Sequence, residues 1–147
     1  MVVTGKDTCT FYASDYHLEM IMLPYINENL KYNKEIFVFT QNNLEDTVNH
    51  LIKNVNINDK MKNKFRNINW RNEDECKYKQ LIQEKNESVI FVKGNEDYIN
   101  KINYNLNQIK KYRKIEIIDC YSIEEVGCKA EIIKQKYKNI LVTGGKK

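Results

Sequence analysis

Glycine and proline are scarce in this chain. Five glycines and one proline occur among its 147 residues, and no glycine-rich loop ending in Lys-Ser or Lys-Thr follows a strand-like segment. A phosphate-cradling loop needs glycine so that backbone amides can approach the anion. The sequence therefore predicts neither a P-loop nor a dinucleotide-binding loop, and we expect no cofactor.

Histidine is equally rare, and the cysteines form no metal-binding pattern. The two histidines are His17 and His50, and the four cysteines include no C-x-x-C pair. Neither a zinc site nor a disulfide framework is indicated by this spacing. We expect no metal site, and we expect the four thiols to be free.

Long apolar runs are missing as well. The most apolar segment, residues 18–26, contains Glu19 and Pro24 and is too short to cross a bilayer. The N-terminus has no signal-peptide pattern. We therefore expect a cytoplasmic protein that makes no contact with membranes.

The charge of the chain points to no particular partner. The formal net charge is +4, and 21 of the 24 basic residues are lysines dispersed over the whole chain. Segment 60–71 interleaves basic residues with Phe65 and Trp70, as a surface that binds single strands would. We interpret it as a solvated segment whose rings pack onto the core, so nucleic acid is not an expected partner.

Five short apolar runs are the main positive feature of the sequence. They span residues 8–12, 35–39, 88–92, 114–118 and 139–142, and the first four lead into helix-like patterns. This alternation predicts one α/β domain over residues 1–147, with three α/β/α layers and a mostly parallel sheet of about five strands.

Four local features complete this prediction. Residues 56–72 are expected to form an irregular insertion with a short helix and a loop. Pro24 predicts a kink or a break in the first helix. The last helix is expected over 126–137, and residues 2–4 form either a short edge strand or a frayed end.

Polar residues follow each apolar run. The carboxyl ends of parallel strands meet at one edge of a sheet, where open α/β folds bind ligands. We expect a small polar or anionic ligand to bind there. The candidate ligand-binding residues are Ser14, Asp15, His17, Thr40, Gln41, Asn42, Lys93, Asn95, Asp119, Tyr121, Thr143 and Gly144.

Three functions are compatible with such an edge. The first is a non-enzymatic sensory or regulatory domain that signals through a regulatory partner protein or a homodimer. The second is a small hydrolase or transferase in which His17 works with Asp119 or Cys120, which requires hydrogen-bond reach between them. The third is a protein–protein interaction module that docks through exposed aromatic and methionine side chains.

Several segments together resemble the MEDS domain, a sensory domain of methanogen and methylotroph regulators. They are Cys-Thr-Phe-Tyr at 9–12, Leu-Pro-Tyr-Ile-Asn-Glu-Asn-Leu at 23–30, the run at 35–39, Ile-Asp-Cys-Tyr-Ser at 118–122 and the stretch 137–145 that ends in Thr-Gly-Gly. The resemblance implies a RecA-like three-layer α/β fold without a working nucleotide-binding loop. It also implies that the domain senses a small ligand or relays a signal and does not turn over a substrate.

Overall fold

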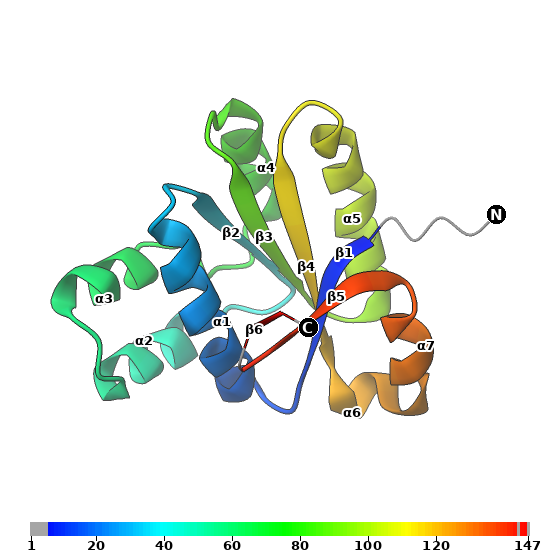
Figure 1. The fold of residues 1–147 in the computed structure, drawn as a ribbon, viewed down its shortest axis with the longest axis horizontal. Coiled ribbons are helices and arrows are strands. Elements are labelled where there is room, and N and C mark those ends of the chain that lie inside the picture. The colour runs from blue at the N-terminus through cyan, green and yellow to red at the C-terminus, as the bar shows by residue number, and fades with distance from the viewer. Residues whose placement is uncertain (1–5, 144, 147) are drawn as a thin grey trace.

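Five parallel strands form the central sheet (Figure 1). The computed structural model describes residues 6–143 and 145–146. The parallel strands are β1 (Lys6–Tyr12), β2 (Glu35–Thr40), β3 (Ser88–Lys93), β4 (Ile115–Ser122) and β5 (Tyr137–Val142). They lie in the order β2-β3-β4-β1-β5, and a short strand β6 (Gly145–Lys146) pairs antiparallel with β5. The predicted sheet of about five mostly parallel strands is confirmed.

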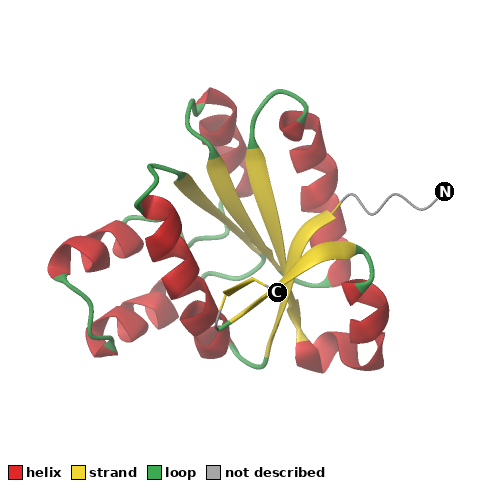
Figure 2. Cartoon of the chain, in the orientation of Figure 1, coloured by secondary structure: helices red, strands yellow, loops and turns green. Residues whose placement is uncertain are grey.

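Helices cover both faces of this sheet (Figure 2). They are α1 (Asp15–Leu30), α2 (Glu45–Asn54), α3 (Asp59–Arg66), α4 (Asp74–Gln83), α5 (Glu96–Lys110), α6 (Ile123–Val126), the 3-10 turn η1 (Gly127–Lys129) and α7 (Ala130–Lys134). Buried side chains of α1, α2 and α3 pack on one face, and those of α4, α5, α6 and α7 pack on the other. The predicted α/β/α layering is therefore confirmed. Among the described residues, no helix combines the length and the apolar character needed to cross a bilayer.

The continuous apolar runs reflect this double coverage. In β3, Val89 and Phe91 belong to the core beneath α1, whereas Ile90 and Val92 belong to the core beneath α5. Successive side chains of a strand point to opposite faces, so a strand covered on both sides is apolar at nearly every position. Burial on both faces explains why β3 is fully buried along its length.

Two predicted boundaries near the C-terminus are wrong. Strand β4 does not stop at residue 118 but continues to Ser122, because the polar side chain of Asp119 is buried and hydrogen-bonded within the structure. The helix predicted over 126–137 is instead the series α6, η1 and α7, and Tyr137 begins β5. Gly127, with φ of 51°, lies where α6 ends, in a conformation that favours glycine.

Of the two outcomes predicted at Pro24, a kink or a break, the break does not occur, since α1 runs through this residue without interruption. Proline removes one backbone donor, but Met22 and Ile26 on either side are buried in the same core and hold both halves of the helix on the sheet. The short helix predicted within 56–72 is present as α3. The proposed edge strand at 2–4 lies outside the described residues.

From the neighbouring strands β1 and β4, the chain continues toward opposite ends of the sheet. From β1 the chain passes through α1 to β2 at one end of the sheet, whereas from β4 it passes through α6 and α7 to β5 on the other side of β1. Helices α1 and α7 therefore cover opposite faces. Neighbouring strands with diverging connections mark the point where ligands bind in open α/β sheets, outside the carboxyl ends of the strands.

Candidate functional site

A buried lysine organises the carboxyl edge of the sheet. Lys93, the last residue of β3, is only 6% exposed. Its Nζ lies 3.0 Å from Oδ1 of Asp15 at the start of α1, donates to Oδ1 of Asn42 at 2.7 Å, and sits 5.3 Å from the centre of the Tyr12 ring. The ends of β1, β2 and β3 are thereby joined. Because Asp15 and Asn42 already occupy the ammonium group, Lys93 is not free to hold an anion.

Glu19 lies next to this group on α1 and is fully buried. Its Oε2 accepts a 2.5 Å hydrogen bond from the Thr47 hydroxyl, whereas Oε1 has no hydrogen-bond partner among the described residues. Burial raises the pKa of Glu19 to about 7; the nearby charge of Asp15 adds to this, and the Thr47 hydrogen bond and Lys93 act against it. The carboxyl group therefore titrates near neutral pH.

Ser14 and His17 shape the first turn of α1. Ser14 is the N-cap, and its Oγ accepts a hydrogen bond from the His17 amide at 3.1 Å. The Nδ1 of His17 accepts from the Ala13 amide at 2.9 Å. This bond fixes the ring against the turn and occupies one of its two nitrogens.

A second link joins the end of β2 to α5. The Oε1 of Gln41 accepts from the Asn95 amide at 2.9 Å, and Asn95 caps α5 by accepting from the Tyr98 amide. Gly94 lies between these contacts, where a Cβ would stand 2.5 Å from a Tyr98 ring carbon and 2.8 Å from Gln41 Oε1. The turn after β3 therefore requires glycine, and it ties the Lys93 group to the N-terminus of α5.

The carboxyl edge also holds a pocket of about 370 Å³. It opens between the turn at Gly94, the first turns of α5 and the end of β4. Its lining includes three carboxylates, Glu96, Asp97 and Glu125, against one ammonium, Lys129, which lies 3.7 Å from Glu96. This charge balance favours a neutral or cationic polar ligand over the anion expected from the sequence.

Most of the predicted site residues lie near this region. Those that form the two linked groups or the first turn of α1 are Ser14, Asp15, His17, Thr40, Gln41, Asn42, Lys93 and Asn95, and Thr40 joins them through a 2.6 Å bond to the carbonyl of Asn42. Tyr121 lines the pocket, although its side chain is largely buried.

Three predicted residues lie elsewhere or cannot be placed. Asp119 is buried in the middle of the α5 face, where Oδ1 accepts from Asn103 at 2.8 Å and Oδ2 accepts from the Tyr137 hydroxyl at 2.5 Å. Thr143 is exposed beside α1 near the β5 edge. Gly144 lies outside the described residues.

The possible catalytic pairs are not assembled. Within the described chain, the hydrogen bonds of His17 run to Ala13 and Ser14, and Asp119 bonds to partners on the other face of the sheet. Cys120 is fully buried, and this burial raises the pKa of its thiol well above the usual value. An uncharged, inaccessible thiol is a poor nucleophile.

The remaining thiols and the basic segment add no catalytic group. Cys9 is buried, and its pKa is raised to about 12, mainly by burial, whereas Cys76 and Cys128 are exposed. Phe65 and Trp70 are buried against each other with ring centres 5.0 Å apart. Their rings fill the core, as interpreted from the sequence, and are not available to stack on bases.

The acidic lining of the pocket was not predicted from the sequence. Glu96, Asp97 and Glu125 are not among the candidate residues, which stop at Asn95 after the third apolar run and at Tyr121 after the fourth. The acidic pairs at 96–97 and 124–125, which come three and two residues after the ends of β3 and β4, are the signal that would have identified them.

Comparisons with known proteins do not identify a family for this chain. No protein-family model, curated protein or solved structure matches the chain. Among the described residues, no three histidine, cysteine, aspartate or glutamate side chains gather closely enough to hold a metal ion.

Proposed function

We propose that this protein is a non-enzymatic sensory or regulatory domain that binds a small polar ligand at the carboxyl edge of its sheet. The ligand is neutral or cationic, and the signal passes to a partner protein or a second copy of the chain. The observation that carries this proposal is the pocket of about 370 Å³ between α5 and α6, with its excess of carboxylates.

The charge of the pocket defines the ligand. A cationic group that enters would meet Glu96 and Asp97 in the first turn of α5 and Glu125 in α6. It would compete with Lys129 for Glu96, because these two side chains are in contact across the pocket. Hydroxyl or amide groups of the ligand could bond to Ser122 and Asn100, which also line it.

The turn after β3 offers a route for the signal. Gly94 and Asn95 line the pocket, and the preceding residue Lys93 anchors the ends of α1 and β2 through Asp15 and Asn42. A ligand that shifts this turn would therefore disturb contacts to helix α1 on the other face. Two sites joined through such a packed group can bias one another's equilibrium.

Binding is favoured over turnover by the state of the reactive groups. One nitrogen of His17 is engaged by the backbone, the Cys120 thiol is buried, and Asp119 lies among Asn103 and Tyr137. General acid–base or nucleophilic chemistry needs such groups within hydrogen-bond reach of each other and of a substrate.

A thermal-shift screen tests the proposal. The panel should contain amines, polyamines, amino acids and sugars, with dicarboxylates and phosphates for comparison. A ligand at about 100 times its Kd stabilises the folded state by about 2.7 kcal/mol, which a thermal shift detects. The stabilising compounds should be neutral or cationic, and Glu96→Gln and Glu125→Gln should each weaken their effect.

The matched control is Glu131→Gln. Glu131 is a carboxylate on α7 whose side chain is 80% exposed and which does not line the pocket. The control should respond to the ligand as the unmodified chain does. A screen without any hit, or hits confined to anions, would contradict the proposal.

A further inference from the structure

In the part of the chain that the structure describes, no strand lies beside the backbone groups on the outer edge of β2. On its inner side, the amides of Glu35 and Gln41 donate to Glu87 and Lys93 at 2.9 and 3.0 Å. Backbone groups of successive residues in a strand point alternately to its two neighbours, so those of Ile36 and Val38 point outward. β2 is the last strand at this end of the described sheet.

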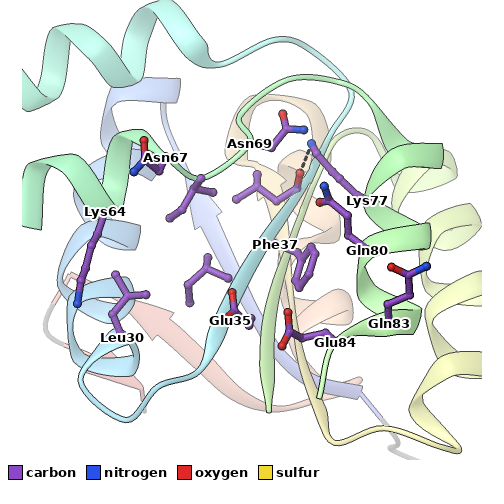
Figure 3. A pocket seen from close by; sticks show the side chains of 13 residues that line it. Leu30, Glu35, Phe37, Lys64, Asn67, Asn69, Lys77, Gln80, Gln83 and Glu84 are labelled. Atoms are coloured by element: carbon purple, nitrogen blue, oxygen red, sulfur yellow. Dashed lines mark hydrogen bonds between the residues drawn. The ribbon is translucent and has the colours of Figure 1, made fainter. Parts of the chain in front are cut away.

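A pocket lies along this edge (Figure 3). Its volume is about 710 Å³, and residues 35–38 of β2 form its floor. One wall comes from the end of α3 and the loop after it, and the other wall comes from α4. The pocket is therefore a groove that follows the strand edge between two helices.

Lys77 closes one end of this groove. Its Nζ donates to the carbonyl of Val38 and to the carbonyl of Arg71, and the residue is 1% exposed. Burial lowers the pKa of Lys77 to about 8. A lysine at a sheet edge normally discourages pairing, but Lys77, which belongs to α4, occupies only one acceptor of β2, the Val38 carbonyl. The amide and carbonyl of Ile36 and the amide of Val38 have no hydrogen bond within the described residues.

We propose that this groove receives an extended segment of a partner protein, which adds to the sheet as a strand beside β2. Unpaired backbone amides and carbonyls at a sheet edge bind another backbone, and pockets for alternate side chains supply specificity. The proposal is independent of the carboxyl-edge pocket and holds whether or not that pocket binds a ligand.

The two walls define the sequence of the segment. On the α3 side, Leu30, Ile36 and Ile68 offer an apolar surface beside Lys64, whose charge disfavours a basic residue at this wall. On the α4 side, Glu35 and Glu84 lie toward the end of the groove away from Lys77 (Figure 3). Side chains of an extended segment alternate between the walls. The partner strand therefore alternates apolar residues with lysine or arginine.

The walls also select a lone strand over a second copy of this chain. In a second copy, β2 is flanked by the same α3 and α4, so pairing of the two edges would require these helices to be brought together with their counterparts. A segment without flanking helices fits between the walls. Residues 35–38 span about 13 Å at about 3.3 Å per residue, so the paired part of the partner is about four residues long.

Synthetic peptides test the proposal on the whole chain. The probe is a labelled, capped heptapeptide that alternates valine and lysine, with its glutamate counterpart for comparison, and binding is measured by fluorescence anisotropy. The lysine peptide should bind, and the glutamate peptide should bind at least about tenfold more weakly. Two further lysine peptides carry N-methyl groups on one or the other alternate set of amides. Only the set that faces β2 should weaken binding, by about tenfold or more, because only those amides donate to it.

Variants of the protein localise the contact. Ile36→Pro removes an outward amide and no ladder hydrogen bond, so it should weaken peptide binding by about tenfold, whereas Ile36→Val should not. On binding, hydrogen exchange should slow at the amides of Ile36 and Val38 but not at Phe37, whose amide already faces β3. The N-methyl comparison uses the unmodified chain and still decides the matter if the proline variant fails to fold.

Three results would overturn the proposal. The first is no binding of the lysine peptide at about 1 mM. The second is equal weakening by the two N-methyl sets, which would exclude a strand-like pose. The third is light scattering that shows a dimer of the chain which Ile36→Pro dissociates, since the occupant of the edge would then be a second copy.

Discussion

Glu19→Gln should stabilise this protein at about pH 8 and change its stability little at about pH 4. The folded chain holds Glu19 with a pKa of about 7, against an ordinary value of 4.5, chiefly because the side chain is fully buried. A raised carboxyl pKa means that the folded state holds the proton more tightly than the unfolded state. The contribution of Glu19 to stability is therefore most favourable below about pH 4.5 and is lost as the pH rises toward 7.

The size of the effect follows from the two pKa values. A shift from 4.5 to about 7 corresponds to about 3 kcal/mol between the two ends of this range. Glutamine has the shape of the protonated acid, carries no charge, and can still accept from the Thr47 hydroxyl. The variant should therefore exceed the unmodified chain by up to about 3 kcal/mol above pH 7.

Urea unfolding at a series of pH values measures this difference. Trp70, the single tryptophan and a buried one, reports unfolding by fluorescence. The matched control is Glu28→Gln on the same helix, where the side chain is 59% exposed and the substitution should show no such pH dependence. Other groups titrate equally in both chains and cancel in the comparison. A difference between Glu19→Gln and the unmodified chain that is the same at about pH 4 and about pH 8 would refute the reasoning.

Two further predictions concern buried groups. Tyr137→Phe removes the hydroxyl that donates to Asp119 and should lower the free energy of unfolding by about 1–3 kcal/mol, whereas Tyr112→Phe at an 86% exposed position should have no measurable effect in urea unfolding. In the folded protein, iodoacetamide should modify Cys76 and Cys128 within minutes and the two buried thiols only after denaturation. Mass spectrometry reads out the second experiment, and rapid modification of a buried thiol would contradict the packing described above.

The central strands could be predicted because their signal is local. Residues 36–39 and 89–92 are apolar at every position, and each stretch lies in a strand covered on both faces. The extent of β4 could not be predicted in this way. Asp119 looks like a strand end, and the groups that make its burial possible, Asn103 and Tyr137, lie 16 and 18 residues away along the chain.

The site was predictable in location more than in character. Polar residues after the strands do meet at one edge, so Asp15, Asn42 and Lys93 could be expected to lie together. The sequence does not reveal that Asp15 and Asn42 already bind the Lys93 ammonium group, because this depends on the distances between their side chains in the fold. The groove along β2 could not be predicted for a different reason. It exists because β2 is the end strand of the described sheet, and the order of the strands cannot be read from the apolar runs.

The position of β1 determines when the sheet can be completed during synthesis. β1 is the first described strand to leave the ribosome, but it lies between β4 and β5, and Thr8 pairs with Ile118 and Asn139. Strands β2, β3 and β4 are neighbours in both sequence and space, so they can assemble while the end of the chain is still being made. Strand β1 therefore stays unpaired until β4 and β5 have been synthesised. Until then both of its edges are exposed, and a chaperone would have to shield them.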